Sequence, residues 1–289
     1  MGTSRAQMVM VKIRLPLYFL ILICYFHQWG SNASYADPVT FNGPFTQGSL
    51  VIAKAPPGST VRLDDTDVQV AADGTFVFGF SRDHDPDVKL SVMLPNGNTF
   101  QKSITVAQRT YQIQRIDGLP PQKVTPPDHV IARIRDDAER VWIARDMYSA
   151  ETYFTGNWIW PSPGIITGVY GSQRILNGLP RRPHFGIDIA APDGTPVIAP
   201  CDGIIRFTDD DLYYSGGTLI IDHGMGVSST FLHMSEIDVS VGDIVTRGQV
   251  IGAVGSTGRS TGAHLDWRIN WFHERLDPAF LVNGVPEPR

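Results

Sequence analysis

Histidine and aspartate side chains recur at short spacings in the C-terminal half of this 289-residue sequence. His264 and Asp266 are two positions apart, and residues at that spacing in a strand point to the same face. His184 and Asp188 are four positions apart, but the glycine between them and the β-branched residues that follow favour a bent or bulged strand over a helix. Together with His233, these side chains offer nitrogen and oxygen ligands suited to zinc, of which a catalytic site uses three and leaves a fourth position to water.

These residues lie in four motifs that resemble the lysostaphin-type zinc endopeptidases, which cut bacterial cell-wall peptides. In chain order the motifs are PHFGIDIAAPDGTPVIA at 183–199, IIDHG at 220–224, FLHMS at 231–235 and GAVGSTGRSTGAHLD at 252–266. The resemblance covers residues 164–283, and its motifs keep the family's order. It implies an antiparallel β-sheet peptidase domain of the duplicated hybrid motif type.

The resemblance also implies a role for each residue. His184 and Asp188 correspond to two zinc ligands of the family, and His233 corresponds to a catalytic histidine. The last family motif is His-x-His, and His264 takes the place of its first, catalytic histidine. Asp266 stands where the family has the third zinc ligand. Because a carboxylate oxygen also binds zinc, we expect Asp266 to be that ligand, with one Zn²⁺ per chain.

The expected activity is therefore hydrolysis of peptide bonds in peptidoglycan stem peptides or cross-links, during remodelling of the cell wall. Zinc would act as a Lewis acid and would acidify a bound water. His233 and His264 would move protons and hydrogen-bond the developing oxyanion, and either could be the base. Arg268 lies two residues beyond Asp266, on the same expected strand face, and could orient that carboxylate.

Three other functions fit parts of the C-terminal sequence. The pentapeptide GRSTG at 258–262 has the Gly-x-Ser-x-Gly pattern of serine hydrolases, but a strand-like segment follows it where that motif requires a helix. Residues 241–251 resemble a biotin or lipoate carrier domain, but the sequence has no lysine after Lys123 to carry the cofactor. A degenerate family member that binds and activates another wall hydrolase remains the main alternative. His223 and His273 are expected to be structural or surface histidines.

The first 36 residues predict export. Basic residues precede the apolar run Leu15–Phe26, and Ser34-Tyr35-Ala36 forms a small-x-Ala cleavage site, which is the layout of a secretory signal peptide. The run is too short for a membrane span, which needs about 20 apolar residues. A lipoprotein signal at Cys24 is disfavoured by the bulky Ile23. We expect a periplasmic or extracellular protein without a stable membrane span.

Composition limits the partners of the exported chain. Removing residues 1–36 takes away three basic side chains and no acidic one, so the formal charge changes from −5 to −8. An acidic protein of this kind is a poor candidate for binding nucleic acid. Cys201 would then be the only cysteine, so no internal disulfide forms, and we expect this residue to be small and buried.

The chain in order predicts a mainly β protein. Residues 37–116 contain short alternating segments at 49–54, 60–63, 75–80, 89–94 and 99–106, separated by turn residues, which indicates a small β-sandwich. This accessory domain has no cluster of reactive side chains. Residues 117–157 read as a proline-rich linker and one amphipathic helix of about twenty residues, capped by Asp128 and with Trp142 in its apolar stripe. Residues 158–289 should form the metallopeptidase domain.

Overall fold

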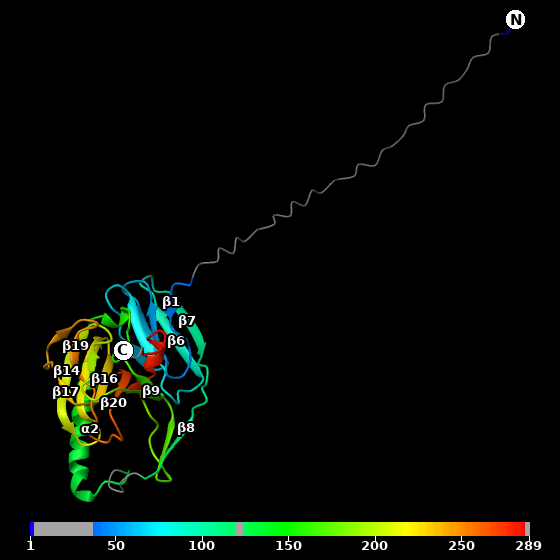
Figure 1. Cartoon of the computed structure of the whole chain (residues 1–289). Coiled ribbons are helices and arrows are strands. Elements are labelled where there is room, and N and C mark those ends of the chain that lie inside the picture. Colours follow the sequence, from blue (N-terminus) through cyan, green and yellow to red (C-terminus); the bar gives the residue numbers. More distant parts are fainter. Residues whose placement is uncertain (3–36, 119–123, 287–289) are drawn as a thin grey trace. The chain divides into compact units, whose positions relative to one another are not determined.

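The computed structural model describes residues 1–2, 37–118 and 124–286. Residues 37–118 and 124–286 form one compact unit (Figure 1). The predicted signal peptide lies outside the described residues apart from its first two. Within the described ranges, no helix combines the length and the apolar character needed to cross a membrane.

Two antiparallel sheets make up the N-terminal part. One has the order β1-β2-β5, formed by Thr40–Asn42, Leu50–Lys54 and Thr75–Gly79. The other has the order β4-β3-β6-β7, formed by Thr66–Val68, Thr60–Leu63, Asp87–Met93 and Thr99–Thr105. Strand β6 shows why they form: Val88, Leu90 and Val92 are buried at every second position, as a half-buried strand requires. The five segments seen in the sequence are all strands, whereas the three-residue strands β1 and β4 are too short to show a period.

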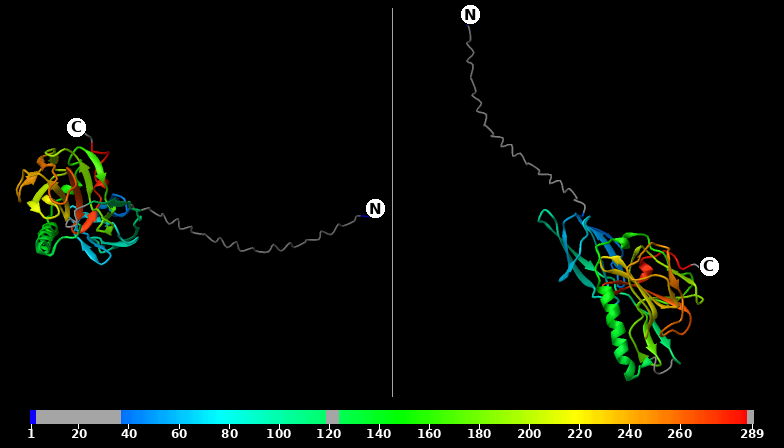
Figure 2. Two further views of the ribbon diagram at one scale, coloured as in Figure 1. Left: turned by 60° about the horizontal axis from the view of Figure 1, so that its bottom comes forward. Right: turned by 90° about the vertical axis from the view of Figure 1, so that its left-hand side faces the viewer.

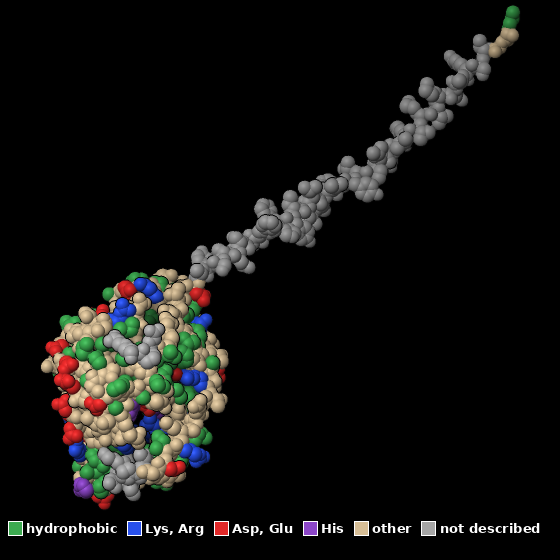
Figure 3. Space-filling model, in the orientation of Figure 1, with side chains coloured by type: hydrophobic (Ala, Val, Ile, Leu, Met, Phe, Trp, Pro, Cys, Tyr) green, Lys and Arg blue, Asp and Glu red, His purple; other side chains and the backbone are tan. Residues whose placement is uncertain are grey.

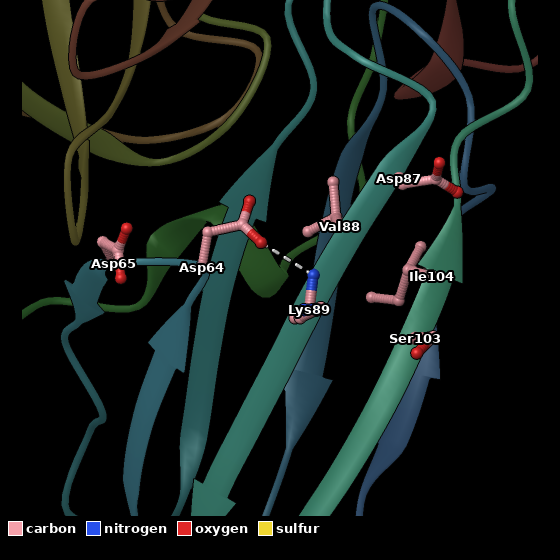
Figure 4. Close-up of a pocket in the computed structure, with 7 residues that line it drawn as sticks. All are labelled: Asp64, Asp65, Asp87, Val88, Lys89, Ser103 and Ile104. Carbon is pink, nitrogen blue, oxygen red and sulfur yellow. Dashed lines mark hydrogen bonds between the residues drawn. The ribbon is translucent and has the colours of Figure 1, made fainter.

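A shallow pocket lies on the four-stranded sheet of this part (Figure 4). Its lining residues are Asp64, Asp65, Asp87, Val88, Lys89, Ser103 and Ile104. The Asp64 carboxylate accepts a hydrogen bond from the backbone N–H of Lys89 at 2.8 Å, so it stabilises the turn after β3. The lining of this pocket has no histidine or cysteine.

A short three-stranded sheet, which we call the arm, links the two halves of the sequence. Its order is β11-β10-β8, formed by Leu179–Pro180, Gln173–Leu176 and Ile113–Ile116. Strand β8 pairs with β10 in parallel, so residues at the end of the 37–116 range belong to a sheet built with strands of the C-terminal part. The arm and helix α2 project from the same end of the C-terminal sheet (Figures 1 and 2).

Helix α2 spans Ile131–Asp146 and follows the 3₁₀ turn η1 at Asp128–Val130. The expected cap was wrong: Asp128 lies inside η1, Pro127 holds the N-cap position, and no side chain caps the turn. The apolar stripe was also only partly right, because Trp142 is 52% exposed. The helix instead contacts strand β14 through ion pairs. Arg140 binds Asp209 at 2.6 Å, and Arg133 binds the Asp211 carboxylate at 2.9 Å.

The central sheet of the C-terminal part has the order β18-β14-β15-β16-β20-β12-β9, and β21 pairs with β20. The strands are β9 Ile165–Gly168, β12 Ile187–Ala190, β14 Gly203–Leu212, β15 Gly216–Gly224, β16 Val227–Met234, β18 Ile244–Val245, β20 His264–Trp271 and β21 Glu274–Leu276. A smaller sheet, β13-β19-β17, is formed by Pro196–Ile198, Val250–Ala253 and Glu236–Ile237. The 3₁₀ turns η2 (Tyr153–Thr155) and η3 (Pro278–Phe280) flank these sheets in the sequence. The prediction of a mainly β fold is confirmed.

The core of the central sheet reaches into the N-terminal sandwich. Trp267 and Phe231 are fully buried in this core, and Leu50 and Val77 of the sandwich belong to the same cluster. At its edge, Arg109 forms an ion pair with Asp277 at 2.9 Å. The sandwich therefore packs directly against the domain that carries the candidate site.

His223 is part of this framework. Its ring is fully buried, and its two nitrogens lie 2.6 Å from the Asp202 carbonyl oxygen and 2.8 Å from the Ser229 hydroxyl oxygen. The carbonyl can only accept, so Nδ1 carries the proton and Ser229 donates to Nε2. Burial lowers the pKa of His223 to about 4, and the folded protein holds this ring neutral.

This neutral ring predicts a pH-dependent stability. Between pH 6.5 and about pH 4, this histidine is protonated in the unfolded chain but stays neutral in the folded chain. The free energy of unfolding therefore falls as the pH falls through this range. From pH 7.5 to pH 5 the loss at this residue should be about 2 kcal/mol. Urea unfolding at several pH values measures how the free energy of unfolding depends on pH. This dependence should be weaker for His223→Gln than for the wild type. Equal dependence in the two proteins would contradict the assignment.

Candidate metal centre

Strands β12 and β20 position the carboxylates of the candidate site. The two strands pair antiparallel, with Asp188 opposite Asp266 and Ala190 opposite His264. The spacing prediction for β20 holds in the structure, because a strand places His264 and Asp266 on one face. The expected bend between His184 and Asp188 is present at Gly186, but the strand begins only at Ile187, so His184 lies outside it.

His184 reaches the same point from the loop before β12. Gly186 makes this possible: a Cβ atom there would lie 2.4 Å from the Asp266 Oδ1 and 2.7 Å from the Trp267 carbonyl oxygen, so a larger residue would push the loop away from β20. Backbone hydrogen bonds fix the loop further, since the His184 N–H donates to the Ser172 carbonyl at 2.9 Å and its carbonyl accepts from Gly171 at 2.7 Å.

The three predicted ligands come together. The Nε2 atom of His184 lies 3.1 Å from Asp188 Oδ1 and 3.4 Å from Asp266 Oδ1. All three ligand atoms lie within 4.8 Å of one another, and all three residues are buried. Two ligands at about 2.1 Å from one tetrahedral ion are separated by about 3.4 Å, so these spacings fit a shared cation.

Two unsatisfied atoms also favour a cation. Among the described residues, His184 Nε2 and Asp188 Oδ1 are buried and make no well-aligned hydrogen bond, although they lie 3.1 Å apart. A buried polar atom without a partner is unfavourable, and a metal ion between the two would remove that penalty. One imidazole nitrogen and two carboxylate oxygens form a set that zinc accepts. The donors present therefore fit a metal ion, and their roles as ligands stay a prediction.

Two arginines hold the carboxylates. Arg268 donates to both oxygens of Asp266, at 2.9 and 2.5 Å, as its place on β20 suggested. Arg174 donates to Asp188 Oδ2 at 3.1 Å and lies 3.0 Å from His184 Nδ1. Sequence analysis missed Arg174, because it comes from strand β10 of the arm and no local pattern links it to the motifs.

The charges of these groups set their protonation. Burial alone would raise the pKa of Asp266, but the nearby Arg268 and His184 charges hold it well below its usual value. Burial would lower the pKa of His184, but Asp266 and Asp188 raise it above its usual value. The Asp266 carboxylate can therefore act as an anionic ligand, and a metal must displace a proton from His184.

The Arg174 contact defines where that proton lies. A guanidinium can only donate, so His184 Nδ1 is the acceptor and the neutral ring carries its proton on Nε2, the atom that faces the carboxylates. Metal binding through Nε2 moves the proton to Nδ1, and two donors would then face each other. The contact between Arg174 and His184 must therefore open when a metal binds.

The two predicted proton carriers lie beside the ligands. The ring centroids of His233 and His264 are 4.8 Å apart, and His264 Nε2 is 3.8 Å from Asp188 Oδ1. Each Nδ1 lies 2.8 Å from a backbone carbonyl oxygen, that of Thr257 or that of Gly262, so each Nδ1 carries a proton and leaves Nε2 free to accept.

His233 is placed by an unusual backbone conformation. Its φ of +67° lies in the left-handed region, which non-glycine residues adopt only where the surroundings enforce it. The hydrogen bond from its N–H to the Ser215 carbonyl at 2.8 Å supplies that constraint. Burial lowers the pKa of His233 to about 4, so the ring is neutral near pH 7.

The remaining predicted residues lie away from the ligands or in other roles. Ser260 is in a loop that leads into strand β20, so the strand–turn–helix of a serine hydrolase does not form here. Cys201 is buried, its thiol donates to the Tyr153 carbonyl at 3.1 Å, and burial raises its pKa to about 11. His273 stacks on Trp142 with 3.3 Å between ring centroids.

Removing Arg174 should strengthen metal binding. Arg174→Met takes away a positive charge beside the centre and frees His184 Nδ1, so the affinity for zinc should rise at least about tenfold. Competition with a chromogenic chelator measures the dissociation constant. Asp188→Ala removes a predicted ligand and should hold no zinc. Asp209→Asn changes a carboxylate of β14 that pairs with Arg140 and not with the candidate ligands, so its zinc affinity should match that of the wild type. Weaker binding by Arg174→Met would mean that the arginine orients Asp188 for the metal.

Asp266 and Arg268 should be coupled in stability. Asp266→His leaves the Arg268 guanidinium without its carboxylate, and breaking a largely buried pair from one side should lower the free energy of unfolding by about 3 kcal/mol. Arg268→Met in the same chain should restore most of this loss. Urea unfolding of the wild type, the two single variants and the double variant, all in the presence of a chelator, gives the coupling energy between Asp266 and Arg268. Additive effects of the two substitutions would show that the pair contributes no coupling.

The part of the chain that holds the candidate site is similar to known proteins. The model of peptidase family M23 matches residues 182–278, a range that includes His184, Asp188, His233, His264 and Asp266. DD-carboxypeptidase/endopeptidase Mpg of Neisseria meningitidis serogroup B is 42% identical over 106 residues, which are 37% of this chain and 24% of that protein. Peptidoglycan DD-endopeptidase ShyA of Vibrio cholerae serotype O1 is 44% identical over 87 residues, 30% of this chain and 20% of that protein.

The chain thus spans about a quarter or less of the length of these curated relatives. A longer match comes from a crystal structure of a Pseudomonas aeruginosa protein assigned to peptidase M23. It is 26% identical, with a TM-score of 0.61, and the match covers 83% of this chain and 95% of that one. Sequence and fold agree that residues 182–278, which contain the candidate metal centre, form a domain that matches peptidase family M23.

Proposed function

We propose that this domain is a zinc endopeptidase that hydrolyses peptide bonds in peptidoglycan stem peptides or cross-links. The observation that carries the proposal is the convergence of His184, Asp188 and Asp266 beside two imidazoles with free Nε2 atoms. The names of Mpg and ShyA, which match this domain, support peptidoglycan as the substrate and a DD-endopeptidase reaction as the chemistry.

Each residue of the candidate site would have a separate role in this reaction. His184, Asp188 and Asp266 would hold the zinc, which when bound supplies a Lewis acid and an acidified water. Nε2 of neutral His233 or His264 would accept a proton, and the imidazolium formed in this way would donate a hydrogen bond to the developing oxyanion or return the proton to the leaving amine. Arg268 fixes the orientation of Asp266 through two hydrogen bonds.

An exported location is part of this proposal. The signal-peptide layout of residues 1–36 would bring the domain to the periplasm, where peptidoglycan is accessible. Beyond residue 36 the sequence has one cysteine, Cys201, so the exported domain needs no disulfide for its fold. The acidic charge of the remaining chain gives no general attraction to an anionic polymer, so recognition would depend on specific contacts at the site.

The sharpest test is His233→Ala. The variant should lower the release of peptides from cross-linked peptidoglycan by at least about 100-fold, because a positioned proton carrier contributes that much or more. Its zinc content should equal that of the wild type, since His233 is not among the three ligands. Chromatography of the digest and elemental analysis of the protein measure the two quantities, and His273→Ala is the control histidine.

Two other outcomes would change the assignment. Loss of zinc from His233→Ala would mean that this residue is a ligand. A wild-type protein that holds no zinc and releases no peptide would favour the alternative, a degenerate member that binds and activates another wall hydrolase.

A further inference from the structure

Both imidazoles beside the candidate ligands are oriented by one loop, residues 255–262, which we call the carbonyl loop. Nδ1 of His233 donates to the Thr257 carbonyl oxygen at 2.8 Å, and Nδ1 of His264 donates to the Gly262 carbonyl oxygen at 2.8 Å. His264 is partly exposed, and Figure 3 shows histidine and Lys or Arg side chains together in a recess of the molecular surface. The position of this loop therefore decides which nitrogen of each ring is free to accept a proton.

The Thr257 hydroxyl holds the carbonyl loop against the ends of two strands. Its oxygen accepts a hydrogen bond from the backbone N–H of Gly217 in β15 at 2.9 Å, and it donates to the backbone carbonyl of Met234 in β16, also at 2.9 Å. Gly217 and Met234 are paired in the β15–β16 ladder, and the register of this ladder shifts between Gly217 and Leu219. The hydroxyl thus bridges the two strands next to an irregularity in their pairing.

Thr257 therefore contacts both His233 and the residue that follows it. The Thr257 carbonyl binds the His233 ring, and the Thr257 hydroxyl binds the backbone of Met234. The ring and the carbonyl that it binds are in this way attached to the same piece of backbone. His233 depends on such support, because its φ of +67° is unfavourable for a residue with a side chain.

Two glycines make room for this contact. A Cβ atom at Gly216 would lie 2.2 Å from the Thr257 Oγ1, so a larger residue there would displace the hydroxyl. A Cβ atom at Gly258 would lie 2.4 Å from the Gly216 nitrogen and 2.6 Å from the Tyr214 carbonyl oxygen. The next residue, Arg259, donates its N–H to the same Tyr214 carbonyl at 2.8 Å. The carbonyl loop and the β14–β15 turn therefore pack backbone against backbone, with the Thr257 hydroxyl between the strands.

We propose that Thr257 is a positioning residue of the peptidase, whose hydroxyl fixes the carbonyl loop so that Nε2 of His233 stays free to accept a proton. A carbonyl oxygen can only accept a hydrogen bond, so its presence at Nδ1 keeps the proton of the neutral ring on that nitrogen. Without the hydroxyl the loop can shift, and the ring can then carry its proton on Nε2, where it cannot act as a base. The inference rests on the proposed peptidase function.

A threonine with a purely structural role would behave differently. Losing the hydrogen bonds of a buried hydroxyl lowers the free energy of unfolding wherever the residue lies, but it leaves the tautomer of a distant histidine unchanged. Thr75 of strand β5 provides this comparison, because it is buried in the N-terminal sandwich and its hydroxyl donates to Asp73 at 3.0 Å. Thr75→Val is therefore the matched control for Thr257→Val.

The first measurement is the tautomer of His233, read from the side-chain nitrogen chemical shifts in NMR spectra of the protein with zinc at about pH 7. The wild type, Thr257→Ser and Thr75→Val should carry the proton on Nδ1, whereas Thr257→Val should carry it partly or wholly on Nε2. His233→Gln identifies the signals. If Thr257→Val does not fold, Thr257→Ala replaces it. An unchanged tautomer in a folded variant without the hydroxyl would overturn the proposal.

The second measurement is the cleavage of a soluble, cross-linked peptide fragment of peptidoglycan. Thr257→Val should lower kcat at least about tenfold, because a small misplacement of a catalytic group is costly. Its KM and its zinc content should stay close to those of the wild type, since Thr257 is neither a ligand nor a substrate contact in the proposed site. Thr257→Ser should restore most of the kcat, and Thr75→Val should match the wild type.

The outcomes separate this inference from the proposed function. A wild type that cleaves no peptide, with a tautomer that changes in Thr257→Val, would reject the peptidase function and confirm that Thr257 sets the His233 ring. A lower kcat in Thr257→Val with an unchanged tautomer would overturn the positioning role. Loss of zinc from Thr257→Val would place the effect of the hydroxyl on the metal ligands and would also overturn it.

Discussion

The antiparallel pairing of β12 with β20 is the constraint on which the site depends. It sets Asp188 opposite Asp266, so two buried carboxylates share one face of the sheet at close range. Such a pair repels unless a cation lies nearby. Gly186 lets the preceding loop pass over β20 and brings His184 to the same point. A slip of one residue in this register would turn Asp266 to the opposite face and abolish the site.

Arginines provide the balancing charge around these carboxylates. Arg268 comes from the same strand as Asp266, whereas Arg174 comes from the arm. The centre can therefore be folded before any metal arrives, because each carboxylate already has a cation. A metal ion would compete with Arg174 for Asp188. The arm thus influences the chemistry of a sheet to which it does not belong.

The N-terminal sandwich contributes through packing. Leu50 and Val77 lie in the core of the central sheet, and Arg109 binds Asp277 next to the end of β21. Because β21 pairs with β20, this contact also stabilises β20, the strand that carries Asp266. The sandwich therefore stabilises strands β21 and β20, although no residue of the candidate ligand set comes from it.

Local patterns in the sequence by themselves determined the strands, the mainly β fold and the pairing of His264 with Asp266 on one face, because alternation and i, i+2 spacing depend only on neighbouring residues. They misjudged the cap at Asp128 and the burial of Trp142, which depend on what the helix packs against. Only the tertiary structure decided that Arg174 lies beside the centre. This residue is far from Asp266 along the chain, and ion pairs form wherever folding brings charges together.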